Sequence, residues 1–91
     1  MEFFATDVMH VSSLGFVAVV VTPDLPAFAP GSEHPAHVTR PDGSVIEASA
    51  IVEYRKLPPF KPVLLRFSGL LPADIPVGSQ IIVNQPTPRD G

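Results

Sequence analysis

The apolar residues of this chain fall in short runs, and proline or glycine lies at most of the breaks between them. The 12 prolines leave no segment with the apolar repeat of about 3.6 residues that is typical of a helix. The runs are rich in Val, Ile and Phe, which favour strands. The pattern predicts six short strands: Phe3 to Val11, Phe16 to Thr22, Ala36 to Arg40, Ser44 to Tyr54, Pro62 to Ser68 and Ser79 to Val83.

Alternation along a strand predicts which side chains share a face. In the first strand, Phe3, Ala5, Met9 and Val11 roughly alternate with polar neighbours, so we expect them to lie on one face. In the fourth strand the alternation resets through Ile51-Val52, which predicts a β-bulge at that point.

The second strand and the segment that follows it have opposite character. Phe16 to Thr22 is almost continuously apolar, which predicts burial on both faces. Pro23 to Pro35 contains four prolines and is expected to be an irregular loop, with Phe28 packing back as an anchor.

Two segments carry clear turn chemistry. Pro41-Asp42-Gly43-Ser44 predicts a hairpin turn in which the Asp caps the backbone and the Gly takes a positive φ. Gly69 to Gly78 predicts a compact corner, where Asp74 starts a single helical turn, accepts a hydrogen bond from a backbone N–H one or two residues on, and is followed by an inward Ile75. The residues expected to have structural roles at turns are Gly15, Gly43, Gly69, Asp74, Ile75 and Gly78.

Short strands, glycine at the corners and the lack of a helical pattern predict an all-β fold: a small six-stranded antiparallel β-barrel. Closure would protect edge strands as apolar as Ile81-Ile82-Val83 from association. Residues 1–84 are expected to form this single domain, and residues 85–91 a flexible C-terminal tail. An oligonucleotide-binding-fold barrel and a small open sandwich are the alternative folds.

Composition indicates a protein that binds other proteins. The chain has 91 residues, 45% of them hydrophobic, and a mean hydropathy of +0.28, which is apolar for one small domain. We therefore expect apolar side chains on a surface that meets a protein partner or a second copy of the chain. The residues predicted to form it are Leu57, Phe60, Leu70 and Leu71. The alternative, that Phe60 and Leu70 fold into the core, stays open.

No constellation of residues indicates catalysis. The chain has no cysteine, which excludes thiolate nucleophiles and Cys-based zinc sites. His34 and His37 lie three residues apart, but without a third ligand nearby we expect exposed loop histidines and no metal site. Arg66 lies inside an apolar strand and is expected to snorkel or to pair with an acid such as Glu53 or Asp7. We assign no catalytic, cofactor-binding or metal-binding residue, and we do not expect an enzyme.

Charge and hydropathy limit the partners and the location. The net charge is −3 and the six basic residues are scattered, so nucleic acid is not an expected partner. The longest apolar run, Leu14 to Val21, is far shorter than the ~20 residues that span a bilayer. Glu2 and Asp7 near the N-terminus, without Lys or Arg, indicate no signal peptide. We expect a cytoplasmic protein with no membrane contact.

A set of motifs resembles a known family. In chain order they are Asp7-Val8-Met9 with Val11, Gly15, Val17 and Val19; Gly31; Val52-Glu53-Tyr54-Arg55-Lys56; and Leu64-Leu65-Arg66 with Gly69, Asp74-Ile75 and Gly78. Together they resemble the second domain of translational GTPases of the elongation factor Tu type, over most of the chain. The resemblance implies the β-barrel of that domain, here as a stand-alone copy.

In that family the second domain contacts the aminoacyl end of transfer RNA. Here Met9, Leu14 and Phe60 place apolar side chains where the family has groups that face this substrate. The predicted function is therefore a non-catalytic, stand-alone β-barrel module that acts through protein–protein contacts. The alternative is an RNA-binding adaptor of the translation machinery, related to the second domain of elongation factor Tu.

Overall fold

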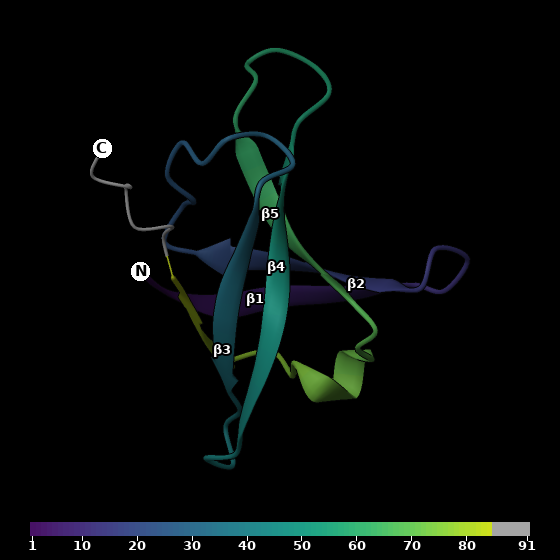
Figure 1. The fold of residues 1–91 in the computed structure, drawn as a ribbon, viewed down its shortest axis with the longest axis vertical. Helices are drawn as coiled ribbons and strands as arrows, with labels where there is room; N and C mark the ends of the chain where they lie inside the picture. Colours follow the sequence, from purple (N-terminus) through teal and green to yellow (C-terminus); the bar gives the residue numbers. More distant parts are fainter. Residues whose placement is uncertain (85–91) are drawn as a thin grey trace, which may run out of the picture.

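The computed structural model describes residues 1–84, which form a closed six-stranded antiparallel β-barrel (Figure 1). This confirms the predicted fold class. The strands are β1 (Glu2–Val11), β2 (Phe16–Thr22), β3 (Glu33–Thr39), β4 (Val45–Tyr54), β5 (Pro62–Ser68) and β6 (Gln80–Val83), and a short 3₁₀ helix, η1 (Pro72–Asp74), precedes β6. No helix within residues 1–84 has the length and apolar character needed to span a membrane. The predicted tail, residues 85–91, lies outside the described residues.

The barrel closes because its first and last strands pair. Around the barrel the strands follow the order β1, β2, β5, β4, β3, β6, and β6 pairs with both β1 and β3. The pairings are antiparallel throughout. Closure supplies backbone partners to apolar strands that would otherwise be exposed edges.

The core combines large and small side chains, as a narrow barrel requires. Phe67, Leu65 and Ile81 are fully buried, while alanines take several other inward positions. Phe28 comes from the loop between β2 and β3, is 7% exposed and belongs to the same cluster. Its predicted role as an anchor is confirmed.

A β-bulge in β1 exchanges the two faces of that strand. The pairing with β2 shifts by one residue between Ala5 and Asp7, so Thr6 is the extra residue. Phe3 and Ala5 point inward before the bulge, and Val8 packs against the core after it. The prediction that Met9 and Val11 share a face with the buried start of the strand is therefore wrong, and Met9 is 45% exposed.

Strand β3 begins at Glu33, three residues before the predicted start, and includes Pro35. The Pro35 carbonyl accepts a hydrogen bond from Asn84, just beyond the last residue of β6. In an antiparallel ladder the N–H and carbonyl of one residue point to the same side, so the missing donor of Pro35 faces the point where β6 ends. The prediction that the irregular loop runs as far as Pro35 is wrong for this reason.

Strand β4 keeps a single alternation past the predicted bulge. Ala50 and Val52 are both 0% exposed, so the bulge predicted at Ile51-Val52 is wrong. The irregularity lies later, between Glu53 and Tyr54, where the pairing with β5 shifts. The register shift comes at the end of the strand, next to the loop that leads to β5.

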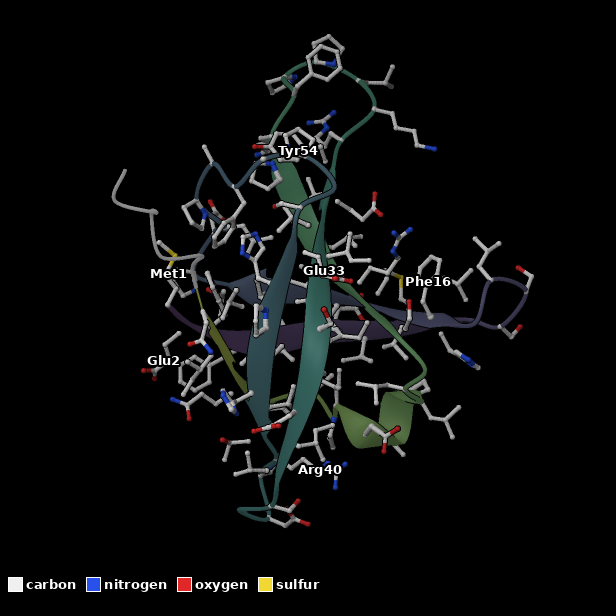
Figure 2. The ribbon with its side chains drawn as sticks, viewed as in Figure 1. Met1, Glu2, Phe16, Glu33, Arg40 and Tyr54 are labelled. Atoms are coloured by element: carbon white, nitrogen blue, oxygen red, sulfur yellow. The ribbon has the colours of Figure 1, made fainter. Side chains whose placement is uncertain are left out.

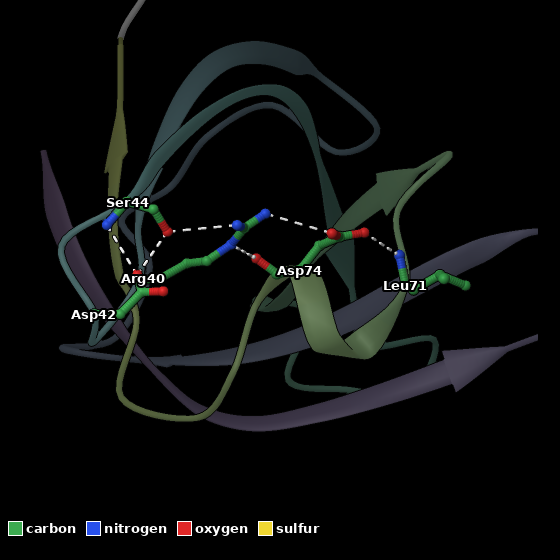
Figure 3. A network of polar contacts seen from close by, with 5 residues as sticks. All are labelled: Arg40, Asp42, Ser44, Leu71 and Asp74. Carbon is green, nitrogen blue, oxygen red and sulfur yellow. Dashed lines mark hydrogen bonds and ion pairs between the residues drawn. The ribbon is translucent and has the colours of Figure 1, made fainter.

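Asp74 holds the corner before β6, but it ends η1 and does not start it. Its Oδ2 accepts a hydrogen bond at 2.8 Å from the N–H of Leu71, three residues earlier. The predicted cap onto a following N–H is therefore wrong: the acid at the third helical position reaches back to the free N–H at the helix start. Arg40 Nε donates to the Asp74 carbonyl at 2.9 Å, and its Nη2 lies 3.4 Å from Asp74 Oδ1 (Figure 3).

The remaining turn predictions hold. Ile75 is fully buried, and Gly78, with a φ of 94°, donates its N–H to the Ala5 carbonyl. In the hairpin after β3, the carboxylate of Asp42 accepts hydrogen bonds from the hydroxyl and the backbone N–H of Ser44 (Figure 3). Both bonds lower the pKa of Asp42, and the bond from the hydroxyl has the larger effect. The glycines predicted at turns all have positive φ: Gly15, Gly43, Gly69 and Gly78.

Candidate binding groove on the outer face of the barrel

The bulge in β1 creates an apolar area on the outside of the barrel. Met9 lies opposite Ala18 of β2, and Val11 lies opposite Phe16. On its other side Ala18 lies opposite Arg66 of β5. Ala18 faces outward but is only 5% exposed, because longer side chains on the neighbouring strands cover it. The prediction that β2 is buried on both faces is confirmed at this position.

This area is part of a groove of about 460 Å³. The groove lies between the turn that joins β1 to β2 and the start of the β4–β5 loop, two hairpin ends that project in different directions (Figure 1). We call it the outer groove. It is lined by Met9, Val11, Leu14, Phe16, Ala18, Glu53, Tyr54, Lys56, Val63, Leu64 and Arg66.

Arg66 is fixed from two sides within this groove. Its Cζ lies 5.1 Å from the centroid of the Phe16 ring, and its Nη1 lies 3.0 Å from Glu53 Oε1. The aromatic ring and the carboxylate together restrict the position of the guanidinium. The predicted pairing of Arg66 with an acid is confirmed, with Glu53 as the partner. The side chains of the pair are 32% and 37% exposed, so this ion pair is open to the groove.

The groove is mainly apolar and carries a few charges. Leu14 in the β1–β2 turn is 70% exposed and Met9 is 45% exposed, so both offer apolar surface to solvent. The charged lining residues are Glu53, Lys56 and Arg66. Methionine, aromatic residues and arginine are the residues enriched at the centres of protein interfaces. The chemistry of the groove therefore suits the binding of another protein.

The four residues predicted to bind a partner do not form one surface. Leu57 and Phe60 lie in the β4–β5 loop and are 69% and 67% exposed, whereas Leu71 is 59% exposed and lies beside η1. Figure 1 shows this loop and η1 at opposite ends of β5. Leu70 is partly buried and packs against the core. The alternative of burial in the core is therefore wrong for Phe60 and partly right for Leu70.

The two neighbouring histidines lie on opposite faces of β3. His34 is 3% exposed, with Nε2 2.8 Å from the Ser32 hydroxyl and its ring 4.5 Å from that of Phe28. His37 is partly exposed, 3.9 Å from the Glu47 carboxylate. Both histidines lie in β3, so the prediction of a loop position is wrong for both, and the prediction of exposure is wrong for His34. The two faces differ because three residues along a strand reverse the face. In residues 1–84 no three His, Cys, Asp or Glu side chains are grouped so that they could hold a metal ion.

The sequence alone does not reveal the outer groove. One signal is present: the adjacent polar residues Thr6 and Asp7 interrupt the alternation of β1, which is how an inserted residue looks in a strand. Treating the two halves of the strand separately would place Met9 outside. The contact between Phe16 and Arg66 has no such signal, because local pattern does not show that β2 pairs with β5.

No family model matches this chain, and neither a curated protein nor a solved structure matches it. The resemblance to translational GTPases rests on the sequence motifs alone.

Proposed function

We propose that this protein is a non-catalytic binding module that recognises a protein partner through the outer groove. The observation that carries the proposal is the group of exposed or half-buried Met9, Leu14 and Phe16 beside the fixed guanidinium of Arg66. The core cluster of the barrel does not include any of these side chains. Exposed apolar groups that are not needed for the core are typical of an interaction site.

The β4–β5 loop enlarges the proposed contact surface. Lys56 lines the groove and is followed directly by the exposed Leu57, with Phe60 three residues further on. A partner seated in the groove can therefore also cover this loop. Leu70 and Leu71 lie at the far end of β5 and would form a separate contact.

We also propose that the barrel is of the second-domain type found in translational GTPases. The proposal is supported by where the motif residues lie. Leu64-Leu65-Arg66 lies within β5, Gly69 follows that strand with a φ of 76°, and Gly78 precedes β6 with a φ of 94°.

A matched pair of variants tests the binding function. Leu14→Glu adds a charge to the groove, and Val45→Glu adds the same charge at an apolar side chain that is 57% exposed and lies outside the groove. Tagged wild-type and variant proteins are used to capture partners from an extract of the source cells, and the bound proteins are quantified by mass spectrometry. We expect Leu14→Glu to reduce capture about tenfold or more, equivalent to about 1.4 kcal/mol, with Val45→Glu unchanged.

Sedimentation of the same proteins addresses self-association. A wild-type dimer that Leu14→Glu dissociates would assign the groove to a second copy of the chain. Equal capture and equal sedimentation by wild type and Leu14→Glu would refute the proposed function.

A further inference from the structure

We propose that the outer groove binds a peptide segment in which a carboxylate stands beside an apolar side chain, and that Arg66 binds the carboxylate. This inference rests on the proposed function and names the chemistry of the partner.

The charge of the groove differs in sign from that of the whole chain. Among its lining residues Arg66 and Lys56 are cations and Glu53 is the one acid, whereas the chain carries a net charge of −3. A local positive site on an otherwise acidic protein attracts anionic groups and directs them to that site.

The guanidinium of Arg66 has donors to spare. An arginine carries five N–H donors, and Glu53 contacts the group through Nη1. The Nε of Arg66 is buried and out of reach of an incoming group, but the side chain as a whole is 32% exposed. A second carboxylate can therefore bind the Nη groups beside Glu53 or replace Glu53 on them. The guanidinium is planar by its own bonding, and the Phe16 ring beside it helps to hold it in place for a two-point contact.

Apolar surface lies next to this cation. The side chains of Leu14 and Met9 are 70% and 45% exposed and line the same groove as Arg66. An anion alone, such as free phosphate, would leave them in water. A peptide with a Leu or Phe side chain adjacent to Asp or Glu would cover them and satisfy the guanidinium at the same time.

The β4–β5 loop of a second copy fits this groove less well. This loop carries the exposed Leu57 and Phe60 and is flanked by Arg55, Lys56 and Lys61. These cations have the same sign as the net charge of the groove, so the two would repel each other. Charge complementarity therefore favours an acidic segment of a different protein.

The test uses two peptides that differ in one group. The acidic probe is acetyl-Gly-Leu-Phe-Asp-Leu-Gly-amide, and the neutral probe has Asn in place of Asp. Binding is followed by amide chemical shifts of ¹⁵N-labelled protein at low salt. We expect shifts on β1, β2 and β5 and a roughly tenfold preference for the acidic probe, the size of one charge-assisted hydrogen bond. The preference should fall as salt is added.

Two variants give opposite expected results. Arg66→Met should abolish the preference for the acidic probe. Glu53→Gln removes the internal competitor and should raise the preference for the acidic probe over the neutral probe by about threefold. Because Glu53 is partly exposed, its variant should stay folded and remains informative even if Arg66→Met unfolds.

Equal binding of the two probes in the groove by wild type would overturn this inference and leave the proposed function standing. A reduced preference for the acidic probe in Glu53→Gln would also overturn it, as would a stronger response to a single-stranded RNA probe under the same conditions. If neither peptide binds, the inference fails, and the Leu14→Glu and Val45→Glu comparison decides separately whether the proposed function fails with it.

Discussion

Two proline-rich loops of this barrel contain the same short pattern and place it in opposite environments. The loop between β2 and β3 contains Leu25-Pro26-Ala27-Phe28, and the loop between β4 and β5 contains Leu57-Pro58-Pro59-Phe60. Phe28 is 7% exposed and belongs to the core, whereas Phe60 is 67% exposed. In Figure 1 the second loop points away from the barrel.

The difference lies in the contacts each loop makes with the barrel. The β2–β3 loop is joined to β4 by hydrogen bonds from Gly31 N–H to the Val52 carbonyl and from Val52 N–H to the Ser32 carbonyl. The hydroxyl of Tyr54 donates to the Phe28 carbonyl at 2.7 Å. The burial of a loop phenylalanine thus depends on the contacts between its loop and the barrel and not on the residues next to it in the sequence.

The largest expected effect comes from Phe28→Ala, which should lower the free energy of unfolding by about 3–5 kcal/mol because it empties a site in the core. Urea denaturation followed by circular dichroism measures the loss. The matched control is Phe60→Ala. Similar losses of stability in the two variants would show that Phe28 and Phe60 contribute equally to the packing of the barrel.

Gly31→Ala should cost about 1–2 kcal/mol, since Gly31 has a φ of 71° that other residues adopt with strain. An added Cβ at this position meets no atom within 4 Å, so the expected loss is conformational and not steric. The same denaturation experiment measures it. An unchanged stability would mean that the anchored loop does not depend on this hydrogen-bonded turn.

Tyr54→Phe removes the hydroxyl that holds the Phe28 carbonyl and should cost about 1 kcal/mol. Amide hydrogen exchange should become faster in the β2–β3 loop and stay unchanged in the β4–β5 loop. Faster exchange in both loops would instead indicate a general loosening of the barrel.

The smallest expected effect is that of the double variant Leu57→Ser with Phe60→Ser, which should change the free energy of unfolding by less than about 0.5 kcal/mol. Both side chains are exposed and lie outside the core cluster. Thermal unfolding checks this result. A loss above about 1 kcal/mol would show that the projecting loop packs on the barrel.

Local chemistry made much of the fold predictable. The Asp42-Gly43 turn and the glycine corner before β6 each follow from a few adjacent residues. The closed barrel follows from the number of short strands and their apolar edges. What local pattern does not determine is pairing between distant segments.

The candidate site depends on that pairing. The outer groove requires the extra residue at Thr6, which turns Met9 outward, and the pairing of β2 with β5, which brings Phe16 to Arg66. His34 is likewise buried because β3 begins at Glu33, although Pro35 predicts a strand that begins only after it. A register shift or a pairing over a long sequence distance leaves only a weak trace in the sequence.

Site-specific photo-cross-linking in the source cells tests most directly whether a protein partner occupies the outer groove. Benzoylphenylalanine replaces Leu14 in one variant and Val45 in another, two exposed positions of which the first lines the groove. We predict that Leu14→benzoylphenylalanine yields a covalent adduct with another protein, linked at an apolar segment next to Asp or Glu. Val45→benzoylphenylalanine should give none. Adducts from Val45 alone, or from neither variant, would contradict the account.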